Sequence, residues 1–451
     1  MDRTKRHYKN LIIGFGKGGK TLASFLASQK EPVAIVEQSN KMYGGTCINI
    51  ACIPTKSLIV NAEKGVPYNE ALAIKDKLTS SLRQKNYDKL NQEGTADVIT
   101  GKASFVSSNE IKVVFLSGEE IFITADRIFI NTGAEPRFPK IAGIDSKKIF
   151  TSTSIMEQQQ KPEKLIIVGG GFIGLEFADM FTKFGSKVTI LDVADEFLPK
   201  EDDDVRAAIY QVLTDKGIDI INGIQLQQIE DINDNTVKVH FNHEGNNMTI
   251  NANAVLLATG RNPNTEGLNL QAADIKTNER GYIIVNEELK TNIPNIWAIG
   301  DINGGPQFTY ISLDDFRIIK NQLTNHKYTS IKQRGDFPSC VFITPPLAQA
   351  GLREKEAIEQ GYRIKVATLP ANAIPKAAIL KEIRGILKAI IDADTNKILG
   401  CTLFCAEAHE IINIIQLAIK HEIPYTAMRD TIYTHPTMTE ALNDLFQNVP
   451  D

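Results

Sequence analysis

The sequence contains the same glycine-rich arrangement twice. An apolar run leads into GFGKGG at 14–19, and a second apolar run leads into GGGFIG at 169–174. Each glycine segment is followed by a helix-like stretch and a further apolar run that ends in an acidic residue, Glu37 or Asp192. In both copies the acidic residue comes 23 positions after the first glycine (14 to 37 and 169 to 192). Ordinary strand–turn–helix connections could explain one copy, but two complete copies indicate two dinucleotide-binding units.

Each glycine in this arrangement has a physical role. The first allows a tight turn, the second lets the backbone approach a pyrophosphate, and the third packs the helix against the strand. The helix N-terminus then holds the phosphates, and the acidic residue accepts hydrogen bonds from ribose hydroxyls. Two sites in one chain imply two different dinucleotides, such as a bound flavin and the nicotinamide that reduces it. The candidates are Gly14, Gly16, Gly19 and Glu37 in the first unit, and Gly169, Gly171, Gly174 and Asp192 in the second.

Further segments define the rest of the architecture. Thr124–Gly133 and Asn253–Gly260 each read as a strand that ends at a glycine turn, and Thr291–Asp301 places an acidic residue beyond an apolar strand. The expected fold is α/β, with two Rossmann-like dinucleotide-binding domains and a C-terminal α+β domain. We expect the flavin domain at 1–150 and 281–330, the nicotinamide domain at 151–280, and the C-terminal domain at 336–451.

The C-terminal third has its own pattern. Strands are expected at Ile386–Ile391 and Ile398–Phe404, followed by a helix at about Ala408–Lys420. No nucleotide-binding glycine segment occurs there.

Composition narrows the class of protein. The 451 residues carry a formal net charge of −4, which gives no electrostatic reason to expect a nucleic acid or an acidic membrane as partner. No apolar run approaches the length of a membrane-spanning helix, and the apolar stretch near the N-terminus is too short for a signal peptide. The five cysteines do not suggest a secreted disulfide framework. A cytoplasmic protein is expected.

Two of the five cysteines, Cys47 and Cys52, lie five positions apart behind a pair of glycines. No further metal ligands are nearby, so a metal site is not expected. Five residues of ideal helix separate Cα atoms by about 7.5 Å, beyond the roughly 7 Å that a disulfide can bridge. A disulfide therefore needs Cys47 in a distorted first turn, and Lys56, one turn after Cys52, would favour a thiolate there. Two buried thiols that act as small apolar side chains are the alternative.

The segment GGTCINIACIPTK at 44–56, the two glycine arrangements and the AIGD segment at 298–301 together resemble the pyridine nucleotide-disulfide oxidoreductases. The resemblance covers nearly the whole chain. It implies a tightly bound, non-covalent FAD and a nicotinamide cofactor. For FAD it implies Gly14, Gly16, Gly19, Glu37, Gly45, Thr46, Lys56, Gly133 and Asp301, and for NAD(P) it implies Gly169, Gly171, Phe172, Gly174, Asp192 and Gly260.

The same resemblance implies the catalytic roles. Cys52 would be the thiol nearest the flavin, and Cys47 the interchange thiol that attacks substrate. Lys56 would pair with Glu176 near the flavin ring, and Phe172 would be the aromatic gate of the nicotinamide pocket.

The segment THPTMTE at 434–440 matches the family's His-Pro-Thr motif. In those enzymes the histidine comes from the partner subunit and acts as acid–base, which implies His435 with Glu440 as its orienter. A thiol nucleophile needs such a base near neutral pKa. A homodimer that shares its active sites is therefore expected, although a His-Pro pair by itself is usually a loop feature.

The segment GGPQFTYISLDDFR at 304–317 points to one subgroup. With GGTCIN and THPTMTEALNDLF, it resembles the reactive-chlorine-resistance enzymes, members of which reduce hypothiocyanous acid. In the expected cycle, NAD(P)H reduces the Cys47–Cys52 disulfide through FAD, and the Cys47 thiolate then reduces the oxidant. One departure is Ala51, where the family usually has glycine.

Three alternatives remain open at this point. Dihydrolipoamide dehydrogenase has the same scaffold, and so does mercuric reductase, although the C-terminal cysteine pair typical of that enzyme is missing. A flavoprotein redox sensor with little turnover would leave His435 and the nicotinamide site unexplained. Cys340, Cys401 and Cys405 are expected to be core or surface thiols. Asp192 would repel a 2′-phosphate, so NADH is favoured over NADPH, although a nearby Lys187 could adapt.

Overall fold

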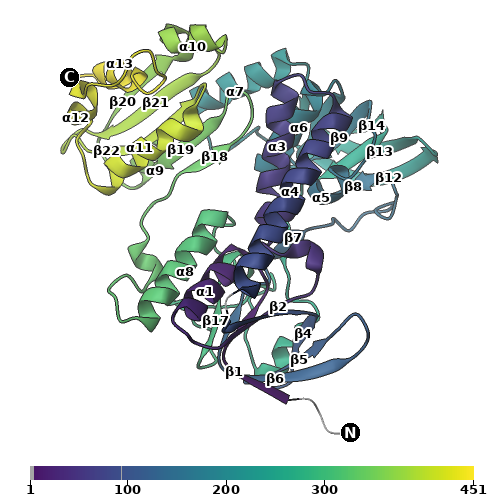
Figure 1. Ribbon diagram of the computed structural model, residues 1–451. Coiled ribbons are helices and arrows are strands. Elements are labelled where there is room, and N and C mark those ends of the chain that lie inside the picture. The colour runs from purple at the N-terminus through teal and green to yellow at the C-terminus, as the bar shows by residue number, and fades with distance from the viewer. Residues whose placement is uncertain (1–4, 93) are drawn as a thin grey trace. The chain divides into compact units, whose positions relative to one another are not determined.

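The computed structural model describes residues 5–92 and 94–451, which form two compact units (Figure 1). The first contains the described residues up to Leu58, together with Asn69–Arg137 and Gly260–Arg334. The second contains Ile59–Tyr68, Phe138–Thr259 and Gly335–Asp451. Residues 1–4 lie outside the described residues, and they are part of the N-terminal stretch for which a signal peptide was not expected.

The first unit is built on a seven-stranded sheet in the order β3-β2-β1-β6-β5-β4, with β17 paired to β6. Strands β1, β2, β3, β6 and β17 are parallel, while β5 is antiparallel to β4 and β6. Strands buried on both faces read as continuous apolar runs, which explains the LII and VAIV segments. The strands are β1 (Lys5–Ile13), β2 (Val33–Glu37), β3 (Ala96–Thr100), β4 (Lys102–Phe105), β5 (Glu110–Val114), β6 (Glu120–Ile130) and β17 (Ile296–Ala298).

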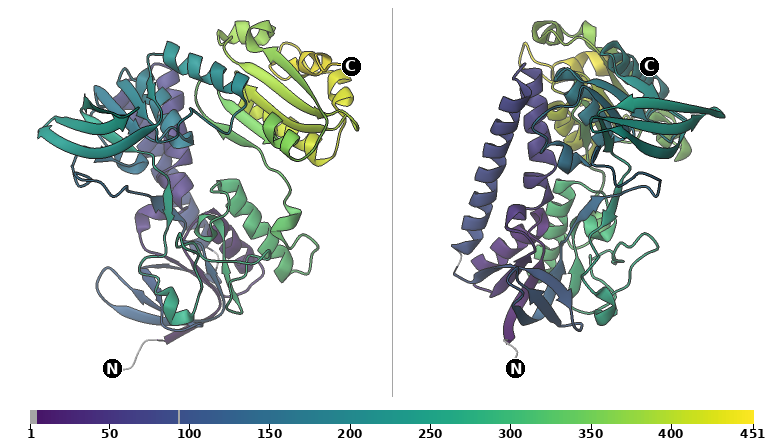
Figure 2. Two further views of the ribbon diagram at one scale, coloured as in Figure 1. Left: turned by 180° about the vertical axis from the view of Figure 1, so that it is seen from behind. Right: turned by 90° about the vertical axis from the view of Figure 1, so that its right-hand side faces the viewer.

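Helices α1 (Lys17–Ser28) and α8 (Thr309–Leu323) lie side by side against this sheet (Figures 1 and 2). Leu22 of α1 and Ile318 of α8 belong to one buried apolar cluster. The other elements that lie in this unit are η1 (Asn40–Met42), α2 (Thr46–Asn49), β7 (Ala134–Pro136), β16 (Arg261–Pro263), η2 (Leu270–Ala273), η3 (Gly300–Asn303) and η4 (Ile331–Gln333). Helices α3 (Cys52–Glu63) and α4 (Tyr68–Asn91) contribute residues to both units.

The second unit contains three sheets. A parallel sheet has the order β11-β10-β9-β15-β8, an antiparallel sheet has the order β12-β13-β14, and a second antiparallel sheet has the order β18-β19-β22-β21-β20. The first two consist of β8 (Ile149–Phe150), β9 (Lys164–Val168), β10 (Lys187–Leu191), β11 (Asp219–Ile221), β12 (Ile224–Asn233), β13 (Thr236–His243), β14 (Asn246–Ala252) and β15 (Ala254–Leu257). The third consists of β18 (Ser339–Val341), β19 (Leu347–Gly351), β20 (Ile364–Pro370), β21 (Ile386–Asp392) and β22 (Ile398–Phe404).

The helices of this unit flank those sheets. They are α5 (Ser152–Ile155), α6 (Phe172–Lys183), α7 (Asp203–Asp215), α9 (Glu354–Glu359), η5 (Ala371–Ala373), α10 (Pro375–Leu380), α11 (Ala408–Lys420), α12 (Tyr425–Asp430) and α13 (Ala441–Gln447). The expected C-terminal pattern of two strands and a helix is confirmed by β21, β22 and α11. The mixed α/β fold class is confirmed as well.

Ion pairs tie α7 to the C-terminal sheet. The Lys388 side chain on β21 is 4% exposed and its Nζ lies 3.3 Å from Asp202, 2.9 Å from Asp204 and 2.6 Å from Glu354. A buried ammonium needs such partners to offset its desolvation.

The chain returns to the first unit at Gly260, while the expected domain bounds stay a prediction. Strand β16 pairs with β7 in the register Arg261–Pro136, so the chain rejoins the first unit at Gly260. Of the helices that the structure describes, none has the length and apolar character needed to cross a membrane.

Candidate active site

The first glycine segment forms the turn between β1 and α1. Gly14 has a φ of +102°, and a Cβ there would overlap the carbonyl oxygen of Asn131. A Cβ at Gly19 would lie 2.7 Å from the Gly14 carbonyl oxygen. Only glycine fits these two positions, and the tight turn that results is the one that a bound pyrophosphate requires.

Glu37 ends β2 beside this turn, and only 8% of it is exposed. Its Oε2 accepts the Phe15 N–H at 3.0 Å and its Oε1 accepts the Ser39 N–H at 3.2 Å. Burial raises the pKa of the Glu37 carboxyl, while these two N–H groups oppose the rise. Each carboxylate oxygen keeps a further lone pair, so Glu37 is oriented as a ribose acceptor.

Asn131 is a positioning residue that the sequence did not single out. Its Oδ1 accepts the Gly19 N–H at 2.9 Å, and its Nδ2 donates to the Ile299 carbonyl oxygen at 2.7 Å. The side chain thereby links α1 to the strand end before Asp301. The only sequence signal for it is a polar residue at the end of an otherwise apolar strand, in FINTG.

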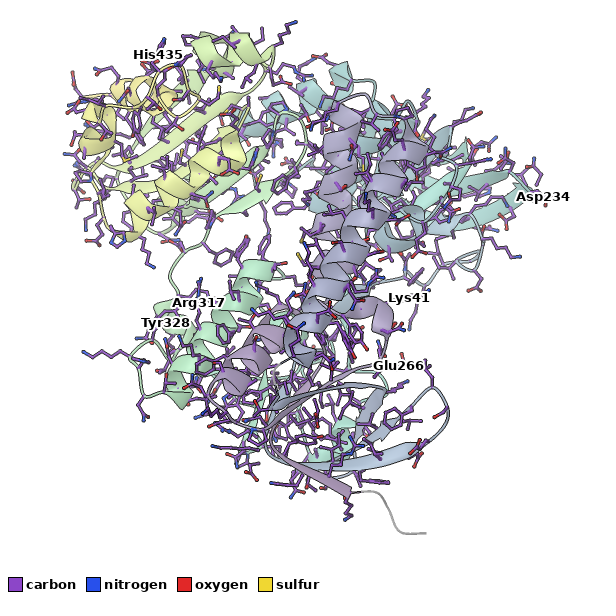
Figure 3. The ribbon with its side chains drawn as sticks, in the orientation of Figure 1. Lys41, Asp234, Glu266, Arg317, Tyr328 and His435 are labelled. Carbon is purple, nitrogen blue, oxygen red and sulfur yellow. The ribbon has the colours of Figure 1, made fainter. Side chains whose placement is uncertain are left out.

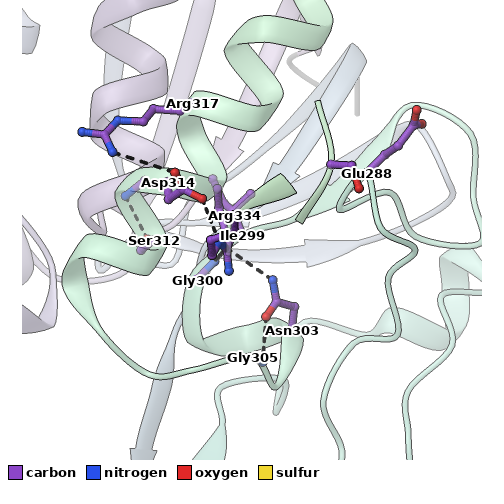
Figure 4. Close-up of polar contacts among 12 residues, drawn as sticks. Glu288, Ile299, Gly300, Asn303, Gly305, Ser312, Asp314, Arg317 and Arg334 are labelled. Carbon is purple, nitrogen blue, oxygen red and sulfur yellow. Dashed lines mark hydrogen bonds and ion pairs between the residues drawn. The ribbon is translucent and has the colours of Figure 1, made fainter. Parts of the chain in front are cut away.

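Asp301 lies in η3, and burial raises its pKa. The preceding Gly300 donates its N–H to Asp315 Oδ2 at 2.7 Å, and Asp315 is 1% exposed. Arg334 pairs with Asp315 and, at 2.7 Å, with Asp314 (Figure 4). Asp315 thus positions the turn that carries Asp301. Asp314 and Asp315 both come from the segment 304–317, which points to the reactive-chlorine-resistance subgroup.

The second glycine segment repeats this geometry between β9 and α6. Gly169 has a φ of +110°, and a Cβ on Gly174 would overlap the Gly169 carbonyl oxygen. Asp192 Oδ2 accepts the Gly170 N–H at 2.6 Å, and its Oδ1 accepts the Ala194 N–H at 3.0 Å. The carboxylate is therefore held at the glycine turn with lone pairs left over, as at Glu37.

Other expected cofactor residues lie at positions compatible with their roles. A Cβ at Gly171 or Gly133 would meet no atom within 4 Å, so both border open space. Gly260 has a φ of +101°, and Phe172, the first residue of α6, is 38% exposed. The residues present in the two turns fit FAD and a nicotinamide dinucleotide, because both turns combine a glycine cradle with an oriented carboxylate.

The two cysteines lie in separate helices. Cys47 is the second residue of the four-residue helix α2, the chain leaves helical geometry at Ile50 with a φ of −139°, and Cys52 begins α3. This break provides the distortion expected for Cys47. Gly45, with a φ of +78°, precedes α2, and its added Cβ would lie 2.6 Å from Gly16 Cα.

The Cys47 and Cys52 side chains interact, and all five cysteines are thiols in the structure. The pKa of Cys47 is raised chiefly by its hydrogen bond with Cys52 and by burial, whereas Thr309 and Lys20 oppose the rise. The hydroxyl of Thr309 also lies 3.6 Å from Cys52 Sγ. The two thiols are close enough to interact, as the formation of a disulfide requires.

Lys56 lies on α3 one turn after Cys52, in the first unit. Glu176 belongs to the second unit, where its Oε1 accepts the Phe342 N–H at 3.0 Å and the residue is 6% exposed. The expected Lys56–Glu176 pair therefore stays a prediction.

His435 and Glu440 form the expected pair. His435 Nδ1 lies 2.8 Å from Glu440 Oε2, while Glu440 Oε1 accepts the Thr437 N–H at 3.2 Å. The His435 side chain is 72% exposed and the Glu440 side chain only 19%, and Figure 3 shows His435 at the surface of its unit. A carboxylate on Nδ1 orients the imidazole and leaves Nε2 for proton transfer.

The remaining cysteines differ from this pair. Cys401 and Cys405 are 1% and 0% exposed, and burial raises the pKa of Cys405 to about 12. Cys340 lies in β18, with its Sγ 3.6 Å from the Val341 carbonyl oxygen. Among the residues that the structure describes, no three His, Cys, Asp or Glu side chains converge as a metal site.

Comparison with known proteins places the chain in a family. Residues 8–315 match the model of the pyridine nucleotide-disulphide oxidoreductases, and residues 337–446 match the dimerisation domain of that family. The chain belongs to the pyridine nucleotide-disulfide oxidoreductases, so the resemblance seen in the sequence is confirmed. The family implies FAD and a nicotinamide cofactor, and the dimerisation domain indicates a homodimer.

The chain is similar to particular relatives over most of their length. The chain is 45% identical to the probable pyridine nucleotide-disulfide oxidoreductase RclA of Escherichia coli, over 98% of this chain and 99% of that protein. A solved Cu(II) complex of E. coli RclA, described as an HOCl-induced flavoprotein disulfide reductase, superimposes with a TM-score of 0.95 at 44% identity, over 98% of this chain and 99% of that one. A mercuric reductase of Staphylococcus aureus is 33% identical, over 96% of this chain and 81% of that protein.

Proposed function

We propose that this chain uses NAD(P)H and FAD to reduce a small electrophilic oxidant, hypothiocyanous acid, to thiocyanate through Cys47 and Cys52. The observation that carries the proposal is the interacting pair of thiols at the break between α2 and α3. Support comes from the similarity to RclA, an HOCl-induced flavoprotein disulfide reductase. A small oxidant also needs no extended substrate pocket.

The thiol chemistry balances as follows. The Cys47 thiolate takes the hydroxyl group from hypothiocyanous acid, which releases thiocyanate and leaves a sulfenic acid on Cys47. The Cys52 thiol then attacks that sulfur, so that a disulfide forms and water leaves. Together the two thiols lose two electrons and two protons. One proton leaves with the hydroxyl group as water, and the other passes to solvent as thiocyanate is released.

The chain's other residues support this cycle. Bound FAD would accept a hydride from reduced nicotinamide and return two electrons to the Cys47–Cys52 disulfide. Gly14, Gly16, Gly19, Glu37 and Asp301 would hold the flavin nucleotide, and Gly169, Gly174 and Asp192 would hold the nicotinamide dinucleotide. The Asp192 carboxylate would repel a 2′-phosphate, so we propose NADH as the preferred reductant.

His435 completes the site from the partner subunit. Its imidazole, oriented by Glu440, holds the proton that Cys47 gives up and returns a proton to the water that leaves. Each homodimer then has two active sites, each with thiols from one subunit and a base from the other. We place this enzyme in the cytoplasm, where thiols are kept reduced.

One assay separates the proposal from its alternatives. NADH consumption by the purified holoenzyme is compared with hypothiocyanous acid, glutathione disulfide and Hg²⁺ as acceptors, and dihydrolipoamide with NAD is tested in the reverse direction. Rapid turnover of hypothiocyanous acid alone is expected. Dominant lipoamide turnover would assign the chain to the dihydrolipoamide dehydrogenases, and dominant Hg²⁺ turnover to the mercuric reductases. Slow reaction with every acceptor would indicate a redox sensor.

A further inference from the structure

Lys20 is a half-buried cation on the helix that begins at the first glycine turn. It directly follows Gly19 on α1, so its side chain leaves the helix one turn after the N-terminus. Its Nζ donates to Asn86 Oδ1 at 2.7 Å and to the Gly44 carbonyl oxygen at 3.3 Å. Gly44 lies three residues before Cys47. The ammonium is therefore held between α4 and the loop that carries the interchange thiol.

Further contacts fix the position of the segment around Cys47 relative to α4, next to Lys20. Asn49, in the same helix as Cys47, donates to the carbonyl oxygens of Tyr43 and Gly45, and its Oδ1 accepts the Arg83 Nε–H at 2.8 Å. The Tyr43 ring stacks on Tyr87 of α4 at 4.8 Å between centroids. Residues 83–87 of α4 thus contact both the Lys20 ammonium and residues 43–49, and they fix the position of Lys20 relative to the segment that carries Cys47.

Lys20 and Cys47 each affect the pKa of the other. Burial, followed by repulsion from Lys17, lowers the pKa of Lys20 to about 8, while Cys47 acts in the opposite direction. Lys20 in turn opposes the rise in the pKa of Cys47. A buried cation is costly to the fold, and a nearby anion offsets that cost. A thiolate on Cys47 is such an anion.

We propose that Lys20 is a positioning residue of the dithiol site, held by Asn86 and Gly44 so that its charge stabilises the thiolate of Cys47. The proposal deepens the proposed function, because it assumes that Cys47 is the interchange thiol. Lys56 lies one turn after Cys52 on α3, whereas Lys20 reaches the loop before Cys47 from α1. Deprotonation of Cys47 releases one proton, which leaves by way of solvent or the His435 base, and Lys20 keeps its own.

The test measures thiol reactivity independently of any oxidant. Holoenzyme is reduced with NADH under anaerobic conditions and treated with iodoacetamide across pH 5–10, and modification of Cys47 is followed by peptide mass. In Lys20→Met the pH midpoint of alkylation should rise by about one unit or more relative to wild type. Lys20→Arg should restore part of that shift because it keeps the charge. Lys41→Met is the matched control, since Lys41 is an exposed cation six residues before Cys47 (Figure 3).

The following outcomes decide whether Lys20 stabilises the thiolate of Cys47. An unchanged midpoint in Lys20→Met overturns the proposal. If that variant fails to retain FAD, Asn86→Leu replaces it, because removal of the 2.7 Å acceptor should loosen the ammonium and shift the midpoint in the same direction. An unshifted midpoint in this variant would count equally against Lys20. If wild type does not turn over hypothiocyanous acid, the proposed function fails, while the alkylation profile still judges Lys20.

Discussion

Nδ1 of His435 lies 2.8 Å from Oε2 of Glu440, and the Glu440 carboxylate is held in turn by the Thr437 N–H. The imidazole is thereby fixed by a carboxylate that is itself largely buried, although His435 is exposed within its own chain. An oriented base on a surface is the arrangement expected where a second subunit completes the site.

Replacement of the base should impair thiol chemistry and leave the flavin unaffected. His435→Gln and Glu440→Gln are expected to lower kcat for hypothiocyanous acid by about 10²-fold, since general acid–base catalysis contributes that much or more. Anaerobic reduction of bound FAD by NADH should be unchanged. Equal loss in both half-reactions would contradict the assigned role.

The proposed sharing of each active site between two subunits makes a second prediction, which concerns mixed dimers. Cys47→Ser and His435→Gln proteins, each with little or no activity alone, should regain about one quarter of wild-type activity when they are dissociated and reassociated in equal amounts. Half of the dimers would be mixed, and each mixed dimer would have one intact site. Failure to recover activity, with mixed dimers demonstrated by mass, would mean that thiols and base come from the same chain.

The two classes of cysteine should differ in reactivity. In the native, NADH-reduced protein, limited iodoacetamide should modify Cys47 and leave Cys401 and Cys405 intact, because burial excludes the reagent and raises the pKa of Cys405 to about 12. Cys47→Ser should keep its yellow FAD but lose oxidant reduction, whereas Cys340→Ser should keep both. Oxidant reduction retained in Cys47→Ser would remove Cys47 from the mechanism.

Arg334 should stabilise the turn that carries Asp301. Arg334→Met leaves the buried Asp315 without its cation, so the free energy of unfolding should fall by about 3 kcal/mol. Arg317→Met is the matched control, because Arg317 is exposed and lies 3.8 Å from Asp314; its loss should cost less than about 0.5 kcal/mol. Urea unfolding in the presence of excess FAD measures both values, and equal losses would contradict the assignment.

Asp192 should determine the choice of nicotinamide. Asp192→Ala removes a charged acceptor for ribose hydroxyls, so kcat/KM for NADH should fall by about tenfold or more. The value for NADPH should rise or stay constant, because the repulsion of a 2′-phosphate is lost. Steady-state kinetics with both cofactors test this, and Asp195→Asn, three residues further along, serves as the control. A wild type that prefers NADPH would overturn the assignment.

Lys20 should make stability depend on pH. Its pKa is about 8 in the folded chain against 10.5 when exposed, so between these values the unfolded chain binds more protons and stability rises with pH. Below about pH 8 the buried ammonium destabilises the fold. Oxidised Lys20→Met should therefore be more stable than wild type at pH 7, and the difference should shrink towards pH 10.5. A constant difference across this range would contradict the burial of a charge.

The sequence predicted most of the scaffold because its signals are local. Each dinucleotide-binding unit shows three signals within about 25 positions of the sequence. They are a glycine at a positive φ of +102° or +110°, an apolar run typical of a buried strand, and a carboxylate at the end of a strand. The break between Cys47 and Cys52 could also be inferred, because an unbroken helix holds two such residues too far apart.

The rest depends on distant residues whose types carry no motif. Asn131 and Lys20 are ordinary side chains in the sequence, and their roles appear only when separate segments of the chain meet at the glycine turn. The pairing between β7 and β16 was not predicted for the same reason, since it leaves no periodic signal in either strand.

The close approach of Gly45 to Gly16 has a consequence for engineering. The loop that carries Cys47 lies directly on the first glycine turn, with no room for even a methyl group between the two backbones. Neither segment can therefore be redesigned or transplanted alone. A protein engineer who wished to move this dithiol into another scaffold would have to move residues 14–19 with residues 43–52, as one indivisible module.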